Sequence, residues 1–211
     1  MPRNLSETEV QAFRDELCAV ATRHFAESGF SGVTLRGLAA DLGVSPMTPY
    51  RYFRNKDEIF QAVRTDAFRR FGASIEDAVR ALPCPLARIK AIGRAYVRFA
   101  HREPHAYRIM FQLDPPAPDT EHEPLQHDQL RRGWQVLHDA MADAVARHLL
   151  RGEPTILAHL AWIPLHGLVA LHLADKLRLG AGIEELVEPL LESFFLGNAP
   201  AELHPVGGTA P

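Results

Sequence analysis

The stretch LGVSPMTPYRYF, residues 42–53, decides how this chain folds, because it holds two prolines in a region that otherwise reads as helix. Proline in a helix interior removes a backbone donor and costs about 3 kcal/mol. Pro46 directly follows Ser45, and proline is tolerated at the first helical position after a serine N-cap. Pro49 falls where an N–H would bond back to the cap. We therefore expect either a loose first turn, or a helix that begins with Thr48 as cap and Pro49 as first residue.

A short helix is predicted just before this stretch. The Thr34 hydroxyl is placed to cap the segment LRGLAADL that follows it. Gly43 ends that segment, since glycine readily adopts the left-handed conformation of a helix terminus. Ala39 is small where two helices must cross closely. Two short helices joined by a tight turn make a helix-turn-helix, whose second helix enters the major groove of DNA.

The rest of the chain also reads as helix, and no segment has the alternation of a strand. Apolar residues at three-and-four spacing predict further helices over 10–28, 55–81, 86–103, 105–113, 125–150, 155–179 and 183–195, with loops at 82–87 and 114–124. The fold class is therefore all-α. We expect an N-terminal three-helix helix-turn-helix domain over 1–56, a connecting helix over 57–84, a larger C-terminal helical domain over 85–198, and a disordered tail over 199–211.

Composition narrows the classes of protein. The 211 residues are 46% hydrophobic, enough for a buried core, and the net charge of -3 argues against a protein that coats nucleic acid non-specifically. The N-terminal residues lack an apolar signal segment, and Pro164 and three histidines interrupt the apolar region 157–174. We therefore expect a cytoplasmic protein that does not cross a membrane.

Eleven histidines and two cysteines raise the question of a metal or an enzyme. His101 and His105 stand four apart, but Pro104 breaks the helical geometry that would bring both rings to one ion. Cys18 and Cys84 lack the spacing of a zinc site, and Cys84 reads as an inert loop cysteine. Since no HExxH, paired carboxylates or nucleophile motif occurs, we expect no enzyme, no cofactor and no metal.

Two segments carry a family resemblance. GFSGVTLRGLAADLGVSPMTPYRYFRNKDEIFQAV, residues 29–63, resembles the DNA-binding domain of the TetR family of bacterial transcriptional regulators. FAHREPHAYRIMF and AWIPLHGLVALHLADKL are similar to the WHG type of C-terminal domain in that family, named for Trp, His and Gly as in Trp162, His166 and Gly167. The resemblance implies a homodimer with one reading head per subunit and a C-terminal domain that binds a small-molecule effector and dimerises.

Side-chain chemistry sorts residues 34–56 by the kind of DNA contact they suit. Hydroxyl and ammonium groups suit phosphate oxygens, which selects Thr34, Thr48, Tyr52 and Lys56. Arginine and tyrosine suit base edges and thymine methyls, which selects Arg36 and Tyr50, and the Met47 side chain and the proline rings offer apolar contact to the same methyls. In the resembling family, DNA contacts fall at the positions matching Arg36, Met47, Thr48, Tyr50, Tyr52 and Lys56.

The expected DNA-contacting residues are therefore Thr34, Arg36, Ser45, Pro46, Met47, Thr48, Tyr50, Arg51, Tyr52 and Lys56. For Tyr52 the competing account is packing in the core of the small domain, where Phe53 belongs. For Arg51 it is an exposed charge without a partner.

A ligand site is expected in the C-terminal domain. His159, Trp162 and His166 share one face of the 155–179 helix, and Pro164 and Gly167 predict a kink beside them. Apolar cavities with a few polar groups are typical of effector sites. The expected lining residues are Phe99, Tyr107, Met110, Phe111, Trp134, Trp162 and His166. Plain core packing is the competing account.

The 183–195 helix carries an unbroken apolar stripe that, with the apolar excess of the helix before it, makes a surface that needs a partner. Two helices from each subunit, packed as a four-helix bundle, would bury it in a two-fold dimer, and packing within the chain is the competing account. A dimer would set two recognition helices about 34–36 Å apart on a palindromic operator. The sequence thus predicts a repressor released by a small apolar molecule. The alternatives are a transcriptional activator, a ligand-independent DNA-binding protein, and a helical enzyme with a vestigial DNA-binding domain.

Overall fold

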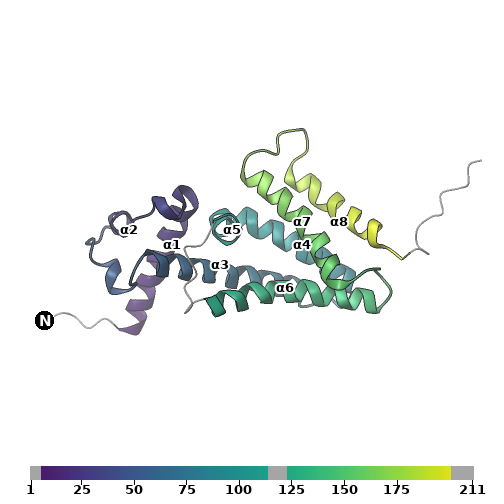
Figure 1. Cartoon of the computed structure of the whole chain (residues 1–211), viewed down its shortest axis with the longest axis horizontal. Coiled ribbons are helices and arrows are strands. Elements are labelled where there is room, and N and C mark those ends of the chain that lie inside the picture. The colour runs from purple at the N-terminus through teal and green to yellow at the C-terminus, as the bar shows by residue number, and fades with distance from the viewer. Residues whose placement is uncertain (1–5, 114–122, 201–211) are drawn as a thin grey trace, which may run out of the picture. The chain divides into compact units, whose positions relative to one another are not determined.

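The computed structural model describes residues 6–113 and 123–200, with only the backbone for 123–130, and every regular element in these ranges is helical (Figure 1). The elements are α1 (Glu7–Gly32), α2 (Leu35–Asp41), the 3-10 helix η1 (Pro49–Arg51), α3 (Lys56–Val79), α4 (Pro85–Arg102), α5 (Pro104–Phe111), α6 (Glu123–Ala146), α7 (Pro154–Leu173) and α8 (Ile183–Asn198). The predicted all-α class is confirmed. Most of the expected loop at 114–124 and of the expected tail at 199–211 lies outside the described residues, but α6 begins at Glu123, two residues earlier than predicted.

Several helix boundaries follow from single side chains. Ser6 and Glu9 form a capping box at the start of α1, and Gly29, with φ +69°, interrupts α1 where the sequence predicts its end. The Asn55 carboxamide oxygen accepts a hydrogen bond of 2.8 Å from the Glu58 N–H and so caps α3. Before α7, the Glu153 carboxylate accepts hydrogen bonds from the first free amides of that helix.

Two helices end earlier than their apolar pattern indicates. α6 stops at Ala146 and α7 at Leu173, whereas the pattern continues to residues 150 and 179. His148 and Asp175 adopt the left-handed conformation, with φ +54° and +53°, just past these ends. Aspartate and histidine are among the non-glycine residues that tolerate this region. The Lys176 N–H donates back to the Leu171 carbonyl at 2.9 Å, so the chain turns away from the helix axis there.

The chain divides into two compact units, one made of residues 1–70 and 103–130 and the other of residues 71–102 and 131–211. In the first unit the core includes Leu17, Phe25, Leu38, Phe53, Ile59 and Phe60. It lies among α1, α2, the N-terminal part of α3 and residues 45–51, which are called the η1 segment here because they contain η1 and the turn before it. Helix α5, distant in sequence, packs against α1 and adds the fully buried Ile109 to this core. The first unit is therefore more than the N-terminal segment of the chain.

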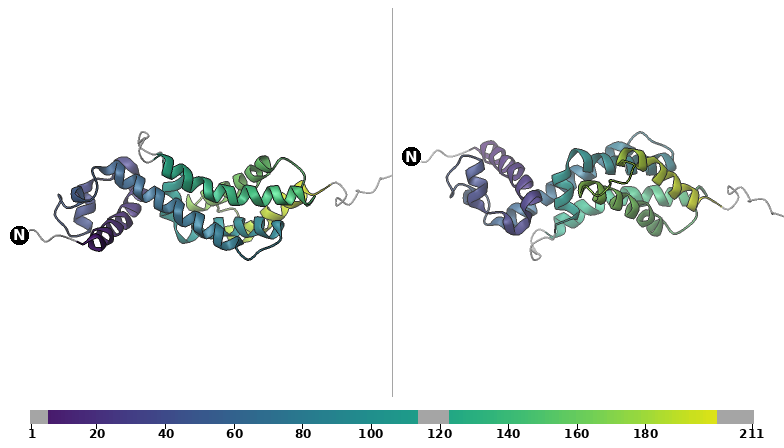
Figure 2. Two further views of the ribbon diagram at one scale, coloured as in Figure 1. Left: turned by 90° about the horizontal axis from the view of Figure 1, so that it is seen from below. Right: turned by 90° about the horizontal axis from the view of Figure 1, so that it is seen from above.

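In the second unit α4, α7 and α8 pack together, and α7 and α8 lie side by side in both Figure 1 and Figure 2. They approach closely at Gly93 of α4, where an added Cβ would lie 2.7 Å from a methyl of Leu191 and 3.3 Å from one of Leu165. The apolar stripe of α8 is buried or half-buried within the chain, with Leu191 almost fully enclosed. Packing within the chain therefore accounts for the stripe that the sequence offered to a dimer.

By length and composition alone, α7 is apolar enough to cross a membrane. One third of its most apolar window is buried, and the helix packs against α4 and α8. A core helix of a soluble protein passes the same test of length and composition. Pro164 and three histidines also lie within α7. The helix continues past Pro164 to Leu173.

Candidate nucleic-acid interface

The first half of the motif has the predicted local chemistry. Thr34 is extended, with ψ 146°, and its hydroxyl accepts a hydrogen bond of 3.1 Å from the Gly37 N–H. Leu38 and Ala39 are fully buried on the inner side of α2, while Arg36 is exposed on the other side. The N-cap fixes where α2 begins, and so it fixes which way Arg36 projects.

The turn after α2 depends on Gly43, which has φ +66°. Its N–H donates to the Ala40 carbonyl at 3.1 Å, and the Val44 N–H donates to the Ala39 carbonyl at 3.0 Å. These bonds satisfy carbonyls that the end of α2 leaves free. A residue with a Cβ would be strained in this conformation, so the turn requires glycine.

The second half of the motif is a turn followed by a single 3-10 turn, η1, in place of an α-helix. Since Pro49 has no N–H, the bond from position 49 to the Ser45 carbonyl is missing, and the Thr48 N–H donates to that carbonyl at 2.8 Å instead. Pro49 is the first residue of η1, as one of the two expected arrangements has it, but the Thr48 hydroxyl makes no capping bond. The prolines thus replace a regular recognition helix with a short, tight one.

The two prolines of this stretch, Pro46 and Pro49, differ in burial. Pro49 is buried, so its ring packs inside the unit and does not offer the apolar DNA contact that the sequence suggested for both prolines. Pro46 is exposed, as are Ser45 and Arg51. The most prominent side chains of the segment are Met47, 68% exposed, and Tyr50, 52% exposed.

Tyr52 is half-buried and packs against α1. Its ring centroid lies 4.3 Å from that of Phe13, and its carbonyl accepts a hydrogen bond from the Arg14 guanidinium, which also lies 4.0 Å from the Phe53 ring centroid. These contacts hold the end of η1 against α1. Packing, the competing account for Tyr52, therefore describes at least part of this side chain.

Lys56 has an internal role in the structure. Its ammonium donates to the Phe30 carbonyl at 2.8 Å and lies 4.2 Å from the Phe30 ring centroid. The contact joins the start of α3 to the carbonyl end of α1, where a cation is favourable. The sequence assigned Lys56 to a phosphate, and no sequence signal pointed to this bond with a residue 26 positions earlier.

A polar cluster joins α4 to α7 in the second unit. The Tyr96 hydroxyl accepts a hydrogen bond of 3.2 Å from the Trp162 indole N–H and lies 2.9 Å from His166 Nδ1. The Trp162 and His166 rings are adjacent, with centroids 5.3 Å apart. Burial lowers the pKa of His166 below its ordinary value, so the ring is neutral at pH 7.

Further aromatic rings pack in the unit that holds this cluster. Phe71 of α3 packs edge-on against both Tyr96 and Phe99, with centroids 5.6 and 5.3 Å away. Trp134 of α6 lies 4.5 Å from the His159 ring of α7. Tyr96 was missed from the sequence, although its spacing of three from Phe99 on α4 could have indicated it.

The seven predicted ligand-lining residues fall in both units. Phe99, Trp134, Trp162 and His166 belong to the second unit, and Tyr107, Met110 and Phe111 belong to the first. Tyr107 and Met110 are buried in the first unit. The structure therefore groups Trp162 and His166 with Tyr96, while α5 contributes its aromatic residues to the unit that holds the helix-turn-helix.

Comparison with known proteins identifies the architecture. Residues 17–63 match the model for bacterial regulatory proteins of the tetR family, and residues 89–194 match the model for the tetracyclin repressor-like C-terminal domain. The chain belongs to the TetR family. It is a DNA-binding transcriptional regulator with a helix-turn-helix, as the resemblance implied. The finer WHG subtype remains a prediction, because the matching C-terminal model is the tetracyclin repressor-like one.

Relatives of this TetR-family regulator include the HTH-type transcriptional activator FasR of Mycolicibacterium smegmatis, 25% identical over 158 residues, which are 75% of this chain and 68% of FasR. The HTH-type transcriptional regulator BetI of Brucella suis is 33% identical over 79 residues, which are 37% of this chain and 40% of BetI. The match to BetI therefore spans less than half of either protein.

Two solved structures have the same fold. A protein of unknown function from Rhodococcus sp. RHA1 superposes with a TM-score of 0.76 at 25% identity, covering 95% of this chain and all of that one. The fatty acid degradation regulator FadR of Bacillus halodurans superposes with a TM-score of 0.73 at 16% identity, covering 92% of this chain and 98% of FadR. At 16% identity the second comparison supports the fold alone.

Proposed function

We propose that this TetR-family regulator is a homodimer that binds a palindromic operator, represses transcription there, and is released by a small apolar molecule. The observation that carries the DNA half of the proposal is the exposure of Met47 and Tyr50 on the η1 segment. Two large side chains held out of a packed core mark a contact surface. With the exposed Arg36 of α2 they offer one bidentate donor and two groups that suit thymine methyls.

Support for these contacts comes from the neighbouring residues. Arg14 of α1 binds the Tyr52 carbonyl at the end of η1, and Lys56 of α3 binds the Phe30 carbonyl in α1. These contacts hold the end of the exposed segment and the start of α3 against α1. We assign Thr34, Ser45, Thr48 and Arg51 to phosphates and register, because their polar groups are exposed or half-exposed beside the reading residues. Lys56 then positions the head through its bond to Phe30.

The dimer half of the proposal rests on α7. Four large apolar side chains of this helix are 46–59% exposed, at positions that follow one helical face: Ile156, Leu160, Ile163 and Leu171. Gly167 lies on the same face, and an added Cβ there would meet nothing within 4 Å. A second copy of α7 would bury this face about a two-fold axis, and Gly167 would let the two backbones approach closely.

The effector half of the proposal rests on the Tyr96 cluster. Its hydrogen-bonding groups are a hydroxyl, an indole N–H and an imidazole that burial keeps neutral, and Phe71 and Phe99 lie beside them. A site with these groups suits an uncharged molecule that has an apolar body and one hydroxyl or carbonyl. Such a molecule would release the operator by favouring the conformation that binds DNA less well.

Activation in place of repression is the second candidate, because FasR is an activator. A reporter with the operator placed either between promoter and start site or upstream of the promoter separates the two. Repression predicts lower output from the first arrangement when the protein is present. Higher output from the upstream arrangement alone would assign activation.

Catalysis, by a helical enzyme with a vestigial DNA-binding domain, is the third candidate. Among the described residues no group of three or more histidine, cysteine, aspartate or glutamate side chains stands ready for a metal ion. A bound molecule that is recovered unchanged supports a regulator, and one that is turned over would support an enzyme. The same regulator role carries the expectation of a cytoplasmic protein.

The effector is tested with the protein's two tryptophans, Trp134 and Trp162, which both lie in the second unit. Straight-chain alcohols and naphthols are titrated while tryptophan emission and operator binding are recorded on the same sample. Quenching that disappears in Trp162→Phe and coincides with loss of operator binding supports the proposal. Quenching without any change in operator binding, across the whole panel, would contradict release by a ligand of this class.

A further inference from the structure

Helix α5 belongs to the first unit, which holds the helix-turn-helix and is called the reading head here. It packs against α1, and Ile109 is fully buried in the same core as Leu17 and Phe25. Only eight residues long, α5 is too short to be stable by itself, so its place depends on what holds it.

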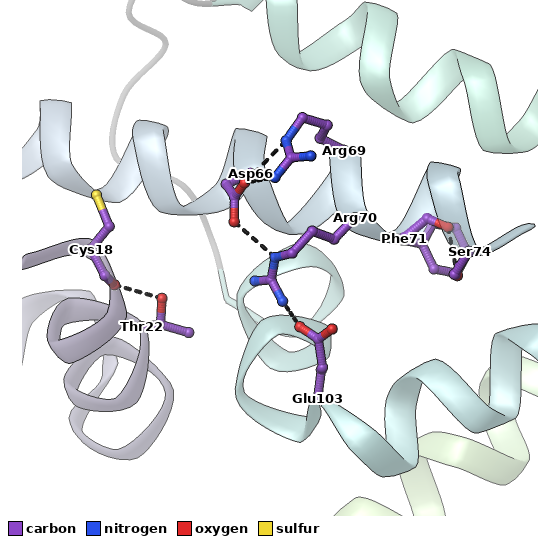
Figure 3. A network of polar contacts seen from close by, with 8 residues as sticks. All are labelled: Cys18, Thr22, Asp66, Arg69, Arg70, Phe71, Ser74 and Glu103. Atoms are coloured by element: carbon purple, nitrogen blue, oxygen red, sulfur yellow. Dashed lines mark hydrogen bonds and ion pairs between the residues drawn. The ribbon is translucent and has the colours of Figure 1, made fainter. Parts of the chain in front are cut away.

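Helix α3 holds α5 at both ends. At the start of α5 the Arg70 guanidinium forms an ion pair with the Glu103 carboxylate (Figure 3). At the other end Arg64 Nη2 lies 3.4 Å from the Met110 carbonyl oxygen, where a cation complements the helix dipole. On α3, Phe68 lies between these two arginines, and its ring meets that of Phe111 edge to face, with centroids 5.8 Å apart.

Arg70 is itself fixed in place by a second carboxylate. Its Nε donates to Asp66 at 2.8 Å, so the guanidinium lies between Asp66 and Glu103 (Figure 3). The neighbouring Arg69 also binds Asp66, at 3.1 Å from Nε, and its drawn contacts stay within α3. Burial alone would raise the pKa of Asp66, but the two arginines more than offset it and hold that pKa below its usual value. Asp66 is therefore charged and orients Arg70 toward Glu103.

Glu103 and Glu153 precede two helices in the same way, but only Glu153 caps its helix. Both α5 and α7 begin with a Glu-Pro pair, Glu103–Pro104 and Glu153–Pro154. The Glu153 carboxylate caps its own helix by accepting from the Thr155 and Ile156 amides at 3.0 and 2.8 Å. Glu103 makes no such cap, because its carboxylate binds Arg70. The start of α5 is thus held by an ion pair with α3, called the tether here, and has no side-chain cap of its own.

The tether also joins two places where the chain changes units. The first unit ends its first segment at Arg70 and resumes at Glu103. All 32 residues of the intervening segment, 71–102, belong to the second unit. Both residues of the ion pair therefore belong to the first unit, at the two points of the sequence where the chain leaves that unit and returns to it.

We propose that the Arg70–Glu103 ion pair is a latch that holds α5 in the reading head and so sets operator affinity. With the latch closed, Ile109 stays in the core beneath α1 and the head keeps its operator-binding form. With it open, Glu103 is free to cap α5 as Glu153 caps α7, and the head relaxes. This inference rests on the proposed operator binding. Both residues are positioning residues and touch no DNA.

The test uses the full-length protein and the operator duplex that the unaltered chain selects. Arg70→Gln, Glu103→Gln and the double variant are compared with Arg69→Gln, which loses a contact to Asp66 but leaves the latch. We expect each latch variant to raise the operator Kd by roughly tenfold and the double variant by no more than either single, since the two residues act as one unit. Arg69→Gln keeps the unaltered Kd. Thermal unfolding of each variant confirms that the fold survives.

Unchanged Kd values in both latch variants would overturn the proposal, as would an equal loss in Arg69→Gln or additive losses in the double variant. Hydrogen exchange of the α5 amides supplies a readout that needs no DNA. The double variant should exchange faster across residues 104–111 than Arg69→Gln does. If the unaltered chain selects no duplex, the proposed function fails, and the exchange result still decides whether the ion pair holds α5.

Discussion

The Tyr96 hydroxyl oxygen on α4 lies 2.9 Å from His166 Nδ1 on α7 and accepts the Trp162 indole N–H at 3.2 Å. A single side chain thus links two residues of α7 that the sequence singled out for a ligand. The same hydroxyl also ties α4 to α7, so its role in stability can be measured before any effector is known.

Removing that hydroxyl should weaken the second unit. Tyr96→Phe keeps the ring against Phe71 and loses the hydrogen bonds, for an expected loss of about 1 kcal/mol in the free energy of unfolding. The measurement is urea unfolding of Tyr96→Phe, His166→Phe and the double variant. Losses that simply add would contradict a direct bond between Tyr96 and His166.

His166 should make stability depend on pH. Burial lowers its pKa in the folded state, so the unfolded chain takes up a proton first as pH falls. Its contribution is fully present above the unfolded pKa of about 6.5 and is lost as pH falls through the lower folded value. Urea unfolding below pH 6.5 should therefore show a shallower decline for His166→Gln than for the unaltered chain. Parallel declines would show that other groups cause the dependence.

A charge placed on the exposed apolar face of α7 should dissociate the proposed dimer. Leu160→Glu places a charge in the centre of that face and should shift the protein from dimer to monomer in sedimentation, because an interface core does not tolerate an unpaired charge. Leu179→Glu is the matched control, since Leu179 is 99% exposed and lies past the end of α7. A Leu160→Glu protein that remains dimeric would place the interface elsewhere.

A substitution at Lys56 distinguishes a structural role of this residue from a contact with a DNA phosphate. Lys56→Met removes the bond to the Phe30 carbonyl and should lower the free energy of unfolding by about 1 kcal/mol. The dependence of operator affinity on salt should keep its slope, because the ammonium already serves Phe30. A slope reduced by about one would contradict this and would show that Lys56 contacts a phosphate, as the sequence indicated.

The two cysteines should differ in reactivity. Burial raises the pKa of the Cys18 thiol to about 11, whereas Cys84 is exposed between two prolines. Iodoacetamide at pH 8 should label Cys84 within the native protein and Cys18 only after unfolding, since the thiolate is the reactive form. Peptide mapping gives the result, and Cys84→Ser should leave the native protein unlabelled. Rapid labelling of native Cys18 would contradict its burial.

Local chemistry made much of the fold predictable. Gly29 and Gly43 adopt positive φ where the sequence ends a helix, and Thr34 and Asn55 cap the helices that follow them. Each of these depends on neighbours a few residues away. The helix-turn-helix and its family could therefore be identified from residues 29–63 alone.

Long-range contacts explain what the sequence could not supply. Arg14 binds Tyr52, Lys56 binds Phe30, and Arg70 binds Glu103 across 26 to 38 positions, and no periodicity encodes such pairs. The ends of α6 and α7 were missed because His148 and Asp175, not glycines, adopt the left-handed turn. The sequence assigned the dimer surface to the last two helices together, and the exposed apolar face lies on α7, because the stripe of α8 packs against α4 and α7.

The central claim is that the η1 segment and α2 read a two-fold symmetric operator. Selection of bound duplexes from random DNA by the full-length protein, repeated with an Arg36→Ala, Tyr50→Ala variant, tests it most directly. We expect a palindrome whose half-sites are about one helical turn, 34–36 Å, or a multiple of it apart, and its loss in the variant. A folded, dimeric protein that enriches no symmetric sequence, or a variant that enriches the same one, would contradict the account.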